Sequence, residues 1–230
     1  MTDPAARFQG FPPPAFAFFH GLAAQNERAW FLAHKDTYET AVKAPMLGLV
    51  ADLSDALASR KVPLVGHEGK AMFRPNRDVR FSKDKSPYKT NAGAVLSRDG
   101  GRRSQGVMYV QLGEDGGFAA LGFYQLEPAA LGAFRDQIVR DPAVWRRLTA
   151  QLTKGGLALR REDSLTRLPR GYDTAAAQGL EDDLRLRSFI LTMRLTKAEL
   201  GKQALTAQLA DFARTGSGLL EFGWHALTAA

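Results

Sequence analysis

The spacing of apolar residues changes along this 230-residue chain, and that change limits the possible folds more than any other feature. Before about residue 70, apolar side chains recur one and two turns apart, as in Phe16, Phe19 and Leu22, which predicts amphipathic helices. After about residue 70, apolar and polar residues alternate along several short segments. Two alternating segments, 107–112 and 118–126, are separated by a glycine-rich loop too short for a parallel connection, so the sheet should be antiparallel.

These patterns predict a definite order of elements. Helices are expected at 16–23, at 30–38 with Asn26 as a candidate N-cap, from Pro45 through Leu57, and from Pro128 and Pro142. Strands are expected at 78–82, 92–97, 107–112, 118–126, 157–161 and 188–195, followed by a helical end interrupted at 216–218. We therefore expect an α+β fold with a central, mostly antiparallel sheet and helices from the N- and C-terminal ends packing on it.

The chain is predicted to form a single domain over residues 1–230, with residues 1–13 as an irregular N-terminal arm. About 45% of the residues are hydrophobic, enough for a sizeable core. There is no cysteine, so disulfides and cysteine-based zinc sites are excluded. Neither a secretory signal nor an apolar run long enough to span a membrane is present, and a cytoplasmic protein that does not bind membranes is expected.

Positive charge is concentrated in one short segment. The formal net charge is +7, from 31 basic and 24 acidic residues. Residues 70–90 contain seven basic and two acidic side chains, so 7 − 2 = +5 of that charge lies within them. Like charges gathered in this way repel one another unless a negative group lies nearby.

This basic segment is the leading candidate for a functional site. Arginine forks and lysine ammonium groups suit phosphate or carboxylate oxygens, so a small anionic ligand is the first hypothesis. The alternation places Arg80 opposite Val79 and Phe81, facing solvent or a cleft. The candidate ligand-binding residues are Arg74, Arg77, Arg80, Lys83, Lys85 and Lys89. The competing interpretation is a solvated edge strand whose lysines block edge pairing, with Asp78 and Asp84 as its ion-pair partners.

Two alternatives use the same segment. A nucleic-acid-binding module would use the same basic patch, although few exposed aromatic residues are interleaved with it for base stacking. If the protein is an enzyme, Asp84 and Tyr88 are the candidate acid–base residues beside the cations. The four histidines, His20, His34, His67 and His225, show no metal-ligand spacing, so neither a metal nor a cofactor is expected.

Three segments together resemble one protein family. They are the run from Arg77 to Thr90, the segment 26–31 with His34, Lys35 and Tyr38, and the segment 169–173. The chain is thereby similar to the domain-of-unknown-function 2461 family (DUF2461). The resemblance implies an intracellular protein of unassigned function. The chain departs from the family pattern at Pro75-Asn76 and over residues 174–179.

Overall fold

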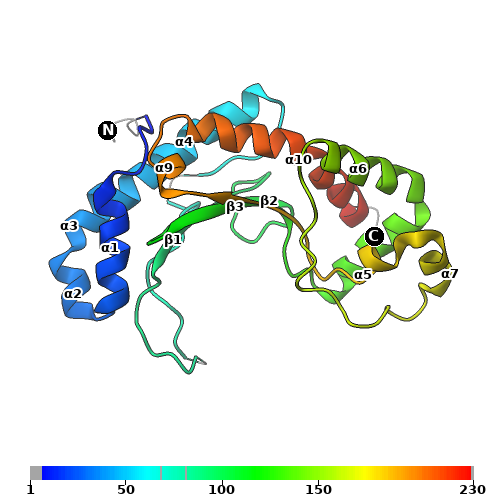
Figure 1. Ribbon diagram of the computed structural model, residues 1–230, viewed down its shortest axis with the longest axis horizontal. Helices are drawn as coiled ribbons and strands as arrows, with labels where there is room; N and C mark the ends of the chain where they lie inside the picture. Colours follow the sequence, from blue (N-terminus) through cyan, green and yellow to red (C-terminus); the bar gives the residue numbers. More distant parts are fainter. Residues whose placement is uncertain (1–6, 68, 81, 229–230) are drawn as a thin grey trace. The chain divides into compact units, whose positions relative to one another are not determined.

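The computed structural model describes residues 7–67, 69–80 and 82–228 (Figure 1). The strands are β1 (Asn91–Leu96), β2 (Val107–Gly113), β3 (Gly116–Phe123) and β4 (Phe189–Leu195). The helices before the sheet are α1 (Pro13–Ala24), α2 (Arg28–Ala33), α3 (Lys35–Thr37), the π-helical segment η1 (Tyr38–Lys43) and α4 (Ala44–Ser59). Those after β3 are α5 (Pro128–Arg140), α6 (Pro142–Lys154), α7 (Asp173–Ala175), the π-helical η2 (Ala176–Leu180), α8 (Glu181–Leu184), α9 (Lys197–Leu200) and α10 (Leu205–Thr228).

The four strands form one antiparallel sheet in the order β1-β2-β3-β4. The register of the first pair aligns Ala94 with Val110 and Leu96 with Met108. A two-residue turn, Glu114-Asp115, joins β2 to β3, and Gly116 follows it at a φ of 122°, a conformation that side chains disfavour. The expected α+β class with a central antiparallel sheet is confirmed.

The chain divides into two compact units. The first comprises residues 1–104, 108–119 and 193–212, and the second comprises residues 105–107, 120–192 and 213–230. Each unit has buried aromatic side chains of its own, and the basic segment belongs wholly to the first.

In the first unit, α4 buries the face that its apolar spacing predicts. The face of α4 that includes Met46, Leu53 and Leu57 is fully buried, and α4 packs against β1. Residues 7–12 form no regular secondary structure, yet Phe8 and Phe11 are buried and pack edge to face. Burial of these two aromatic rings stabilises the packing of residues 7–12, the described part of the expected irregular arm, against the helices.

β1 is covered along its outer edge by an irregular segment. Met72 pairs with Ala94, and the Phe73 amide donates to the Gly93 carbonyl at 2.9 Å. Farther along the strand, Val65 pairs with Ser97. Because these bonds occupy backbone groups at an edge that would otherwise be open, the chain enters the basic segment from a fixed position on the sheet.

The second unit is built around stacked aromatic rings. Phe134 of α5 lies face to face with Phe189 at a centroid distance of 3.8 Å, and Trp145 of α6 packs edge-on against both rings. A strand expected at 157–161 is reduced to one isolated bridge, between Leu159 and Leu191. Beside it, the Arg160 amide donates to the Ile190 carbonyl at 2.9 Å.

The predicted interruption of the last helix is wrong, because α10 continues through Gly216, Ser217 and Gly218. The two glycines serve packing instead. A Cβ at Gly216 would lie 2.5 Å from Leu121 Cδ2, and one at Gly218 would lie 3.0 Å from Leu148 Cδ1. Their lack of a side chain lets α10 approach its neighbours closely, and this packing offsets the low helix propensity of glycine.

Candidate functional site

The basic segment forms a two-armed loop anchored at its base (Figure 1). Asn76 and Tyr88 form an antiparallel bridge. Beside it, the Arg77 amide donates to the Pro87 carbonyl at 2.9 Å and the Lys89 amide donates to the Pro75 carbonyl at 2.8 Å. The arms therefore run antiparallel at their base and lead away from β1.

The strand predicted at 78–82 is wrong for the residues that the structure describes, and Phe81 lies outside them. Two aspartates explain the difference. Asp78 accepts from the Arg80 amide at 3.3 Å, and Asp84 accepts from the Ser86 amide at 2.9 Å. Aspartate side chains that bond to the backbone two residues ahead compete with ladder hydrogen bonds, and the chain turns instead of extending.

Asn26 fixes the loop to the N-terminal helices. Its side-chain amide donates to the Tyr88 carbonyl, and its side-chain carbonyl accepts from the Tyr88 amide, both at 3.0 Å. It was expected to cap α2, but Glu27 occupies the N-cap position and makes no side-chain bond there. Asn26 lies one residue before that N-cap position, and both polar groups of its side chain are directed to the Tyr88 backbone instead of the helix end.

The Tyr88 ring completes this attachment. It is buried and stacks on Phe31 of α2, with 4.2 Å between the centroids and an interplanar angle of 10°. Phe31 in turn packs against Phe18 and Tyr38. The aromatic face of the N-terminal helices thus meets the base of the basic loop, and the position of Tyr88 is set by packing.

At the loop tip the candidate cations pair with neighbouring acceptors. Arg80 forms a bidentate pair with Asp78 at 2.9 and 2.6 Å, and Arg77 pairs with Asp84. Lys85 donates to the Val79 carbonyl at 3.0 Å. Bonds from Ser86, followed by that from Arg77, lower the pKa of Asp84 to about 2, so the carboxylate is fully ionised and a weak base at neutral pH.

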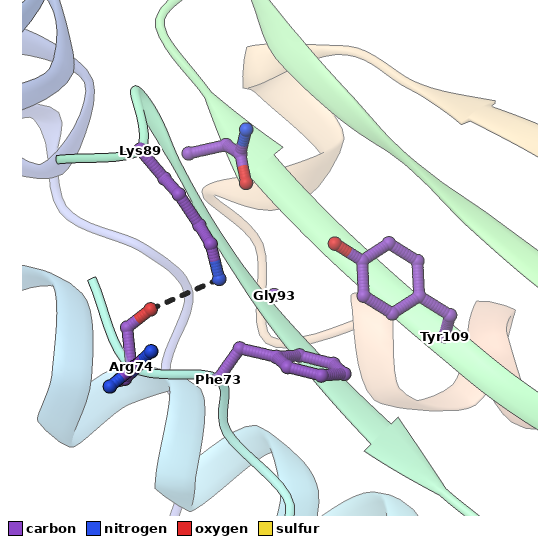
Figure 2. A pocket seen from close by; sticks show the side chains of 6 residues that line it. Phe73, Arg74, Lys89, Gly93 and Tyr109 are labelled. Atoms are coloured by element: carbon purple, nitrogen blue, oxygen red, sulfur yellow. Dashed lines mark hydrogen bonds between the residues drawn. The ribbon is translucent and has the colours of Figure 1, made fainter. Parts of the chain in front are cut away.

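At the loop base the arrangement differs, because cations converge on a hollow. A pocket of about 250 Å³ is lined by Phe73, Arg74, Lys89, Asn91, Gly93 and Tyr109. Figure 2 shows the Lys89 side chain running along this pocket and the Tyr109 hydroxyl directed towards it. None of the six described lining residues is acidic. An anion would therefore meet positive charge without a competing carboxylate from this lining.

The pocket wall combines an aromatic ring with two cations, Arg74 and Lys89, and a third cation, Arg102, lies near that ring outside the lining. The Lys89 ammonium lies 5.4 Å from the centre of the Phe73 ring, and the Arg102 guanidinium carbon lies 5.8 Å from it. Lys89 also donates to the Arg74 carbonyl at 3.2 Å. Burial first, and then the positive charges of Arg74 and Arg102, lower the pKa of Lys89.

Gly93 makes room for the opposite wall. A Cβ there would lie 2.3 Å from the Tyr109 hydroxyl oxygen, so only glycine lets the tyrosine lie across β1. The hydroxyl donates to Gln111 Oε1 at 2.9 Å. Burial raises the pKa of Tyr109, and the phenol stays protonated at neutral pH.

The structure therefore separates the six predicted ligand-binding residues into two groups. Arg74 and Lys89 line the pocket, whereas the other four lie on the loop beyond the Asn76–Tyr88 bridge: Arg77, Arg80, Lys83 and Lys85. Sequence reasoning missed Phe73, Asn91, Tyr109 and Arg102. The sequence signals available were a glycine inside a strand, at Gly93, and the Arg102-Arg103 pair, but neither indicates which residues meet in space.

Residues 7–67, 69–80 and 82–228 contain neither a cluster of metal ligands nor a membrane-spanning helix. No group of three or more histidine, aspartate or glutamate side chains in these ranges is placed to hold a metal ion. No helix in the same ranges is both long and apolar enough to cross a membrane.

The fold and the pocket together define an α+β protein with a cationic hollow at the edge of an antiparallel sheet. The model of the family described as "Conserved hypothetical protein (DUF2461)" matches residues 14–222, most of the chain, and the chain belongs to this family. A comparison with curated proteins finds no match.

Proposed function

We propose that the chain binds a small anionic ligand, bearing phosphate or carboxylate, in the pocket lined by Arg74 and Lys89. The observation that carries the proposal is the convergence of these two residues and Arg102 around Phe73, without an acidic residue in the described lining. An anion bound there would relieve the repulsion that lowers the pKa of Lys89. Phe73 and Tyr109 would exclude water from part of the ligand and strengthen its electrostatic attraction.

A thermal-shift experiment tests this proposal with inorganic phosphate and succinate as probes. At a probe concentration about 100 times its dissociation constant, the unfolding free energy of the wild type should rise by about 2.7 kcal/mol. For a chain of this size that is a midpoint increase of roughly 5–10 °C. Lys89→Met should lose most of the increase, because it removes the ammonium group and keeps much of the side-chain volume.

Lys83→Met is the matched control, because it makes the same change of charge on the loop tip. It should retain the wild-type increase. Phosphate also stabilises proteins by exclusion from their surface, so only the difference between variants counts as binding. Equal midpoint increases in the wild type and in Lys89→Met, with either probe, would refute the proposed site.

The alternative function, nucleic-acid binding through the whole basic patch, makes a different prediction. Six engaged cations would give a log–log dependence of affinity on salt with a slope of about −5 on duplex DNA. The pairing of Arg77 and Arg80 with carboxylates argues against it, and so does the burial of Tyr88 against Phe31, which withdraws that ring from base stacking. Duplex binding with this slope, weakened by Lys83→Met, would favour the alternative.

A further inference from the structure

The amine of Lys89 lies in surroundings that favour its uncharged form. Its side chain is partly withdrawn from solvent, in a pocket that Arg74 also lines and whose described lining contains no acidic residue. Arg74 and Arg102 are the charged groups that act on it, and both are positive. Within the described ranges no carboxylate forms an ion pair with Lys89.

This combination has a chemical consequence. A lysine next to other cations, in a partly desolvated pocket, releases its proton more easily than a lysine in water, and the free amine is a nucleophile. Burial and the two arginines lower the pKa of Lys89 accordingly. Below the usual pKa of lysine, the fraction of free amine rises about tenfold for each unit by which the pKa falls.

We propose that Lys89 is an amine nucleophile that forms an imine with a small anionic aldehyde or ketone held in the pocket. The inference rests on the proposed function, because Arg74 would hold the anionic group of the ligand, with the positive charge of Arg102 near Phe73 adding to the attraction. A pocket of about 250 Å³ suits a ligand of a few carbon atoms, such as a 2-oxo acid.

The step balances without any further reactant. The nitrogen lone pair of Lys89 attacks the carbonyl carbon and forms the C–N bond, the C=O π bond breaks, and one of the two amine protons passes through solvent to the oxygen, which becomes a hydroxyl group. The second amine proton then passes to that hydroxyl group, the C–O bond breaks as water leaves, and the nitrogen lone pair forms the C=N bond.

Reductive trapping tests this inference on the intact wild-type chain. The protein is incubated with pyruvate and sodium cyanoborohydride at pH 7.5, and peptide mapping by mass spectrometry measures the modification rate of each lysine. Lys89 should react several-fold faster than Lys83 or Lys85, because its pKa is lowered and its pocket attracts the carboxylate of pyruvate. With acetone, a neutral ketone of similar size, the modification rate of Lys89 should exceed that of the other lysines by a smaller factor, because the arginines do not attract a neutral molecule.

An Arg74→Met variant separates recruitment from reactivity. It should slow the reaction of Lys89 with pyruvate more than the reaction with acetone. If phosphate stabilises the wild type selectively but Lys89 reacts with pyruvate no faster than Lys83, the imine inference is wrong and the binding site stands. Phosphate could fail to stabilise the wild type selectively while pyruvate still shows a stronger preference for Lys89 than acetone does. In that case the anions chosen as probes are wrong, and the assignment of Lys89 as the nucleophile stands.

Discussion

Two hydrogen bonds from one asparagine determine where the basic loop begins. Asn26 reaches both backbone groups of Tyr88, 62 residues away, as a neighbouring strand would. The two contacts are partly buried, and a partly buried backbone group left without a partner is costly. Asn26 therefore stabilises the loop base and, through the adjacent Lys89, the geometry of the pocket.

Replacing Asn26 tests this role. Asn26→Ala should lower the free energy of unfolding by about 1–3 kcal/mol, because it removes both partners of Tyr88. Urea unfolding followed by circular dichroism measures the change. The neighbouring Gln25 is exposed, so Gln25→Ala should stay within about 0.5 kcal/mol of the wild type. A loss no larger than that of the control would show that Asn26 does not hold the loop.

A second residue-scale prediction concerns Asp84. Its pKa is lowered from 3.8 to about 2, first by the Ser86 bonds and then by Arg77. Because the pKa is lower in the folded loop, the stabilisation is fully present above pH 3.8 and is lost as the pH falls towards 2. A carbon-detected NMR titration of the carboxyl group should give a midpoint near 2, and Ser86→Ala should raise it. A midpoint near 3.8 in the wild type would contradict the loop-tip geometry.

Among the elements, β3 and α5 contain glycines with opposite requirements. Gly122 has a φ of 132°, and a Cβ there would lie 2.1 Å from the backbone oxygen of Phe189. Gly132 lies inside α5, and a Cβ there would meet nothing within 4 Å. The first glycine is required for close strand packing, whereas the second only weakens its helix.

The two alanine variants should therefore change stability in opposite directions. Gly122→Ala should destabilise the chain by about 2 kcal/mol or more, because backbone strain and a backbone clash add together. Gly132→Ala should stabilise it by up to about 1 kcal/mol through helix propensity. Chemical denaturation of both variants beside the wild type measures the difference, and a stable Gly122→Ala protein would argue against the strand geometry.

Periodicity predicted the elements whose residues pack by one face. The apolar face of α4 and the alternation along β2 reflect burial on one side, and that signal is local. It failed at residues 78–82, where Asp78 and Asp84 bond to nearby amides and override the alternating pattern. It failed again at Gly216, where the glycine permits close packing that no local pattern reveals.

At the scale of the whole molecule, the candidate site depends on contacts between distant segments. Arg74 and Lys89 were predicted from local charge, and the Asn76–Tyr88 bridge brings them together. Arg102, Tyr109 and Asn26 reach the loop or its pocket from outside the basic segment, so charge density along the chain could not include them. The same density of positive charge also placed four cations of the loop tip among the predicted ligand-binding residues, and these four do not line this pocket.

Six of the seven basic side chains in residues 70–90 thus fall into two groups with different roles, two at the loop base and four at its tip. The tip balances much of its charge with Asp78 and Asp84, as a solvated loop does. The base gathers charge around a hollow with no acid in its described lining, an arrangement that favours an anion. The central claim is that the base, and not the tip, is the binding site.

Crystals soaked in selenate test this claim most directly, because selenate resembles phosphate in shape and charge and its selenium can be located by anomalous diffraction. The account predicts an anomalous peak in the pocket beside Arg74 and Lys89, and its absence from crystals of Lys89→Met. A wild-type map with selenium only at the loop tip, or with none in the pocket, would contradict it.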